Sequence, residues 1–99
     1  MRITKQQIHI IQKTIKKLAG EHAQITLFGS RVDDTKKGGD IDLLVTLPEP
    51  ATHPAELSAK ISSQLMRQFE GRKVDILLLA PNLKKLPIHV VAQQTGTML

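Results

Sequence analysis

Apolar side chains recur every three or four residues near the N-terminus of the chain. This spacing predicts an amphipathic helix, and the residues of its apolar stripe are Ile8, Ile11, Ile15 and Leu18. Thr4 and Gln7 have the spacing of a capping box at the start of this helix, and Gly20 is suited to end it. We therefore expect one face of the helix to pack on the rest of the domain.

Five further stretches predict regular structure. Apolar residues at helical spacing indicate a helix over about residues 54–70 and a short one over about 87–95. Short apolar runs between glycine- and proline-containing turns indicate strands over about 24–29, 40–46 and 73–79. The last residues, 97–99, are expected to be an extended tail. The order of elements predicts an α/β (α+β) fold, a small mixed sheet packed with about three to four helices.

Composition narrows the class of protein further. The 99 residues are expected to form a single domain over 1–99, with 40% hydrophobic residues and only two aromatic ones, so that the core is aliphatic. The chain contains no cysteine, which excludes a disulfide framework and a thiolate metal site and is consistent with a cytoplasmic protein. No stretch is apolar over the roughly 18 residues that a membrane span needs, and we expect no membrane association.

The net charge of +5 indicates an anionic partner. Lysine and arginine are scattered along the chain, and aromatic side chains that could stack on bases are nearly absent. A basic surface that assists capture of a nucleotide is therefore favoured over direct binding of nucleic acid. The four histidines show no metal-ligand spacing, and structural or surface roles are favoured for them.

Three aspartates carry the candidate chemistry. Asp40 and Asp42 are two positions apart on a predicted strand, so their side chains point to the same face, roughly 6.5–7 Å apart along the backbone. Two carboxylates this close are compatible with a hard divalent cation such as Mg²⁺. Asp75 is embedded in an apolar strand, where a buried carboxylate needs a metal or a partner. If the two strands are neighbours, the three carboxylates converge; each aspartate alone could instead be a turn residue or pair with a lysine.

A glycine–serine turn precedes these aspartates. Gly29 allows a ligand to approach the backbone closely, and the amides and hydroxyl around Ser30 can donate to phosphate oxygens. Arg31 could contact phosphate or form a surface ion pair with a loop aspartate. Asp33 and Asp34 could add metal contacts, but their ordinary role as turn residues is favoured.

The order Gly29-Ser30, Asp40-x-Asp42 and a later Asp75 resembles the nucleotidyltransferase superfamily of DNA polymerase β. Within it, the small size resembles the minimal nucleotidyltransferases, the MntA-like antitoxins that are paired with HEPN-domain toxins. The resemblance implies the nucleotidyltransferase fold, with Asp40, Asp42 and Asp75 as catalytic metal ligands for Mg²⁺. It also implies that Gly29, Ser30 and Arg31 bind ATP.

The same resemblance implies that AMP is transferred from ATP to a tyrosine of a HEPN-like toxin. Because a chain this small has no room for a domain that selects the acceptor, we expect acceptor specificity to come from a partner or a second copy of the chain. Nine residues separate Ser30 from Asp40, where relatives commonly have ten, and Gly39 replaces a common serine. These differences keep open an antitoxin that binds its partner without catalysis. A nucleotidyltransferase that acts on a small molecule or on RNA is the other alternative. Association through a sheet edge or a helix face, with itself or with a partner, is expected.

Overall fold

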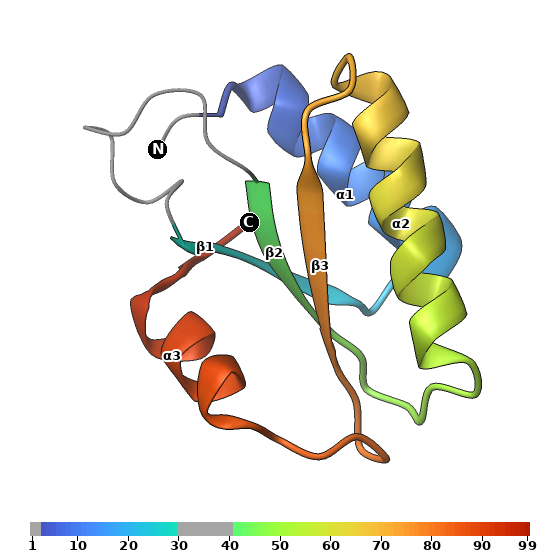
Figure 1. Ribbon diagram of the computed structural model, residues 1–99, viewed down its shortest axis with the longest axis vertical. Coiled ribbons are helices and arrows are strands. Elements are labelled where there is room, and N and C mark those ends of the chain that lie inside the picture. The colour runs from blue at the N-terminus through green and yellow to red at the C-terminus, as the bar shows by residue number, and fades with distance from the viewer. Residues whose placement is uncertain (1–2, 30–40) are drawn as a thin grey trace.

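A computed structural model describes residues 3–29 and 41–99 of the protein. Its helices and strands follow the order that the sequence predicts (Figure 1). The elements are α1 (Lys5–Ala19), β1 (Gln24–Phe28), β2 (Ile41–Thr46), α2 (Pro54–Gln68), β3 (Val74–Leu79), α3 (Pro87–Thr95) and β4 (Thr97–Met98). No helix in the described part of the chain is both long and apolar enough to cross a membrane.

The four strands form one mixed sheet in the order β3-β2-β1-β4. β1 pairs antiparallel with β2 and with β4, whereas β2 and β3 are parallel. β2 and β3 are parallel because α2 connects them. This helix returns the chain to the end of the sheet at which β2 begins, so that β3 runs in the same direction. The predicted fold class is confirmed. The expected extended tail becomes β4, which pairs through Thr26 and Leu27 of β1.

The helices cover the two faces of the sheet unequally. α1 and α2 lie side by side on one face, here called the two-helix face, and α3 lies on the other, here called the α3 face (Figure 1). Alternate residues of the three longer strands point to the two-helix face and build the main core; they are Ile25, Leu27, Ile41, Leu43, Val45, Val74, Ile76 and Leu78. Aliphatic residues dominate this core, as the composition predicts.

Local hydrogen bonds fix the ends of α1. The Gln7 amide donates to Thr4 Oγ1 (3.1 Å) and the Thr4 amide donates to Gln7 Oε1 (2.9 Å), which confirms the capping box. At the other end, Gly20 has φ of 107° and its amide donates to the Lys16 carbonyl. The sequence therefore determines both ends of this helix locally.

The end of α2 differs from the sequence expectation in one residue. The predicted helix over about 54–70 would end directly before Gly71, a residue suited to stop it, but the first residue with positive φ after the helix is Glu70, at 56°. The Gly71 amide donates to the Met66 carbonyl (2.8 Å), which is the long hydrogen bond of a Schellman motif. Glu70 thus occupies the left-handed position that glycine usually takes, and Gly71 comes one residue later.

Candidate active site

The parallel pairing of β2 and β3 places two of the predicted site aspartates side by side. In the register of these strands Asp42 lies opposite Asp75. Neighbouring strands are about 4.8 Å apart, and residues in register on parallel strands point to the same face. Because the residues that flank each aspartate point to the two-helix face, both carboxylates lie on the α3 face. The convergence that the sequence predicted is confirmed for this pair.

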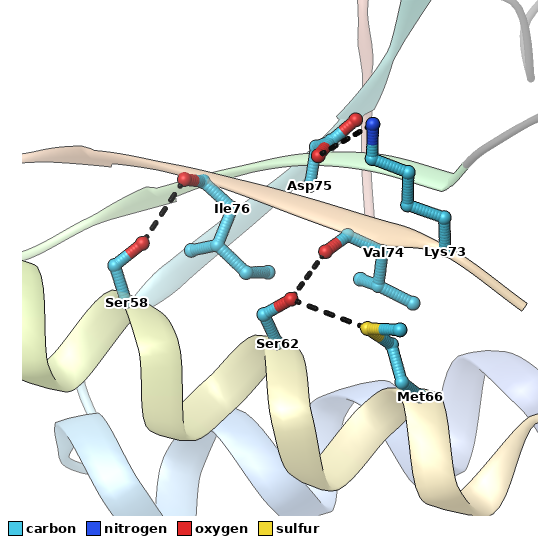
Figure 2. Close-up of polar contacts among 7 residues, drawn as sticks. All are labelled: Ser58, Ser62, Met66, Lys73, Val74, Asp75 and Ile76. Carbon is cyan, nitrogen blue, oxygen red and sulfur yellow. Dashed lines mark hydrogen bonds and ion pairs between the residues drawn. The ribbon is translucent and has the colours of Figure 1, made fainter. Parts of the chain in front are cut away.

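Asp75 is more exposed than the sequence suggested. Its apolar neighbours predicted a buried carboxylate, but 51% of its side chain is exposed. Figure 2 shows the reason: Val74 and Ile76 point toward α2, whereas Asp75 points away from it. Alternation along the strand buries the neighbours and leaves the carboxylate accessible, so the burial argument for this residue was wrong while its site assignment is unaffected.

Lys73 is a charged neighbour of the site that the sequence analysis did not single out. Its Nζ lies 4.0 Å from Asp75 Oδ1, and 63% of its side chain is exposed (Figure 2). Ion pairs this exposed contribute on the order of 0.2–1 kcal/mol, so the pair does little for stability. The signal was present in the sequence, because Lys73 and Asp75 are two positions apart on a strand and share a face.

Gly29 lies directly against the Asp42 carboxylate. Its φ of 73° falls in the left-handed region, which favours glycine. A Cβ built on Gly29 would lie 3.0 Å from Asp42 Cγ and still closer to Oδ2. The absence of a side chain at Gly29 is therefore what allows the Asp42 carboxylate its position at the end of β1, opposite Phe28.

Three predicted site residues, Ser30, Arg31 and Asp40, lie outside the described residues, as do the loop aspartates Asp33 and Asp34. Among residues 3–29 and 41–99, no group of three His, Cys, Asp or Glu side chains forms a metal site. The described part of the chain thus contributes two carboxylates, and Asp40 remains a predicted third ligand.

The donors that are described fit a hard divalent cation. Two carboxylates that face each other across neighbouring strands repel, and a nearby positive charge relieves this repulsion; Lys73 supplies one such charge beside Asp75, and a bound cation would supply more. Magnesium is typically bound by one or two protein carboxylates together with substrate phosphates and water. Asp42 and Asp75 provide the two carboxylates. Any side chain at position 29 would place its Cβ against the Asp42 carboxylate, so glycine keeps this carboxylate in place. The arrangement is suited to transfer of a phosphate-containing group with metal assistance.

His89 has a structural role in the described structure. His89 is buried beneath α3, where its Nδ1 accepts from the Leu86 amide (2.9 Å) and its Nε2 lies 2.9 Å from the Leu78 carbonyl. Since Nδ1 accepts a hydrogen bond, the neutral ring carries its proton on Nε2 and donates it to Leu78. The structural role expected for a histidine is confirmed at this position.

A mixed sheet with paired carboxylates on its α3 face forms a candidate site for metal-assisted transfer of a phosphate-containing group. The model of the nucleotidyltransferase domain family matches residues 8–94 of the chain. The match covers most of the sequence, and the chain belongs to the nucleotidyltransferase domain family. A search of curated proteins finds no match to it.

Proposed function

We propose that this protein is a Mg²⁺-dependent enzyme that transfers AMP from ATP to a tyrosine hydroxyl of a HEPN-type toxin, with release of pyrophosphate and of the hydroxyl proton, and thereby acts as a cytoplasmic antitoxin. The observation that carries the proposal is the register of β2 and β3, which sets Asp42 beside Asp75 on the α3 face. Membership of the nucleotidyltransferase domain family supports the reaction class. The acceptor and the antitoxin role extend the resemblance to minimal nucleotidyltransferases.

Each residue has a defined task in this proposal. Asp42 and Asp75 hold the cation with Asp40, and Gly29 leaves room for the Asp42 carboxylate. When bound, the metal supplies positive charge that offsets the charge developing on the transferred phosphate. Ser30 and Arg31 are predicted to bind the remaining phosphates.

The openness of the site supports an acceptor that belongs to another protein. Half of the Asp75 side chain is exposed, so a hydroxyl presented on the surface of a partner can reach it. The chain itself contains no tyrosine. Any AMP found on tyrosine must therefore be on a partner.

Transfer of label from α-labelled ATP tests the proposal. The chain is incubated with Mg²⁺ and the purified product of the neighbouring gene, and label on that product is measured. We expect Asp42→Asn and Asp75→Asn each to reduce transfer by about 100-fold or more, because each removes a carboxylate that would hold the cation at the reacting phosphate. Glu49→Gln is the matched control, since it neutralises an exposed carboxylate in the loop after β2.

A non-catalytic antitoxin gives a different result. No label on the partner, together with tight binding by both the wild-type chain and the Asp40→Asn/Asp42→Asn variant, would contradict transfer and leave a steric mode of neutralisation. Label that appears only on RNA or on a small molecule would contradict the protein acceptor while retaining the reaction class.

A further inference from the structure

The exposed large hydrophobic residues of the described chain gather in one segment. Four belong to α3 and the residue before it, and one to β4; they are Leu86 (44% exposed), Ile88 (51%), Val90 (37%), Val91 (54%) and Met98 (66%). Ile88 and Val91 are neighbours on the helix surface, as are Leu86 and Val90. We call these five residues the α3 patch.

The α3 patch lacks the charged groups that normally accompany an exposed helix. Residues 86–99 contain no Asp, Glu, Lys or Arg, although 23% of the whole chain is charged. Beneath it, α3 buries His89 and Ala92 against the sheet. A helix that is apolar on both its inner and outer sides is normally covered on both, and a contiguous apolar patch on a monomer commonly marks an interaction site.

The edge of β3 is a poorer place for a partner to associate. Three of its carbonyl groups accept hydrogen bonds from side chains. Ser62 Oγ donates to Val74 and Ser58 Oγ donates to Ile76 (3.2 Å) (Figure 2). His89 Nε2 donates to the Leu78 carbonyl. A strand added at this edge would have to displace these contacts. β4, at the opposite edge, contributes only two residues. Of the two modes of association that the sequence left open, the structure favours the helix face.

Charge distinguishes between the candidate occupants of the patch. The segment 76–99 contains Lys84 and Lys85, both exposed and just before α3, and no acidic residue. A second copy joined through the same patch would add two more lysines and no acidic group from this segment. The complementary surface is therefore an apolar one bordered by Asp and Glu, on a different protein.

We infer that the α3 patch is the docking surface for the acceptor protein, which presents an apolar surface with an acidic rim. This inference rests on the proposed function, in which the acceptor hydroxyl belongs to a partner. α3 lies on the same face of the sheet as Asp42 and Asp75, so a partner seated on the patch extends over the side of the sheet that carries the carboxylates. Docking and transfer thus share one face.

Binding measured without catalysis tests the surface. The product of the neighbouring gene is titrated calorimetrically into the Asp75→Asn chain, which carries in addition either Ile88→Ser/Val91→Ser or Lys84→Glu/Lys85→Glu. We expect each pair of substitutions to weaken binding by about 10-fold or more. The serine pair removes apolar side chains that anchor the partner, and the glutamate pair reverses the charges that face its acidic rim. Lys13→Glu/Lys17→Glu, exposed on α1, is the matched control and should leave affinity within about threefold.

Three results would overturn this assignment of the docking surface. The first is an affinity that neither patch variant changes, and the second is no binding of the neighbouring gene's product at all. The third is sedimentation of the chain alone as a dimer that Ile88→Ser/Val91→Ser dissociates. The third would identify a second copy as the occupant. Failure of the proposed function would look different. If the wild-type chain transfers no label but its binding still depends on the patch, the proposed reaction is contradicted and the docking surface is retained. Retained circular dichroism of each variant confirms that the fold is unchanged.

Discussion

Replacing Gly29 with alanine is the sharpest test of how the site is built. An alanine at φ of 73° costs about 1–2 kcal/mol, because its Cβ crowds the backbone in the left-handed region. The same Cβ would lie 3.0 Å from Asp42 Cγ, so the carboxylate must turn away from its rotamer at a cost of about 0.5–1.5 kcal/mol. We expect a total loss of roughly 1.5–3.5 kcal/mol in the free energy of unfolding.

Gly71→Ala provides the matched comparison. Gly71 has φ of 85°, close to that of Gly29, but a Cβ built on it meets nothing within 4 Å. Urea unfolding of both variants therefore separates the backbone cost, which they share, from the displacement of Asp42, which only Gly29→Ala should show. Titration with Mn²⁺ gives a second readout, and we expect the affinity of Gly29→Ala to fall by about 10-fold or more, because a carboxylate ligand has lost its position.

Equal losses of stability in the two variants, with equal Mn²⁺ affinity, would refute the reasoning. That result would mean that the Asp42 carboxylate adapts to an alanine without consequence, and that glycine is needed only for its backbone conformation. A loss of stability in Gly29→Ala with unchanged Mn²⁺ affinity would keep the steric argument but remove Asp42 from the metal ligands.

Three further substitutions test the packing around the site by urea unfolding. Ser62→Ala removes the donor to the Val74 carbonyl and should cost about 1 kcal/mol, whereas Ser63→Ala, one residue along and exposed, should cost less than about 0.5 kcal/mol; equal effects would contradict a specific edge contact. His89→Leu leaves the Leu78 carbonyl without its donor and should cost about 1–3 kcal/mol, and a neutral result would remove the structural role of this histidine. Glu70→Gly relieves the left-handed backbone at the end of α2 and should stabilise the fold by about 0.5–1 kcal/mol, while a loss would show that the glutamate is not strained there.

The candidate site separates what sequence reasoning could predict from what it could not. Spacing alone predicted that Asp40 and Asp42 share a face, because period-two alternation fixes which residues of a strand point the same way, whereas Asp75 was singled out as the one charge in an apolar strand. The same alternation should have corrected the expected burial of Asp75, since its apolar neighbours point to the opposite face. Because Asp75 was expected to be buried, Lys73 was not considered as its partner, although the two residues are two positions apart and therefore share a face. The contact between Gly29 and Asp42 was beyond sequence reasoning, because it joins a residue just after β1 to one in β2 and depends on how these strands pair.

The sequence by itself determined the three helices, the three longer strands and both ends of α1, since capping, residue periodicity and glycine conformations act over a few residues. This is why the limits of α1, from the capping box at Thr4 to Gly20, could be read from the chain. Only the tertiary structure decided which strands pair and in what register, and hence that Asp42 lies opposite Asp75. It alone showed that residues 97–98 join the sheet and that the outer side of α3 is apolar and exposed. Strand pairing and exposure both depend on how distant parts of the chain pack against these residues.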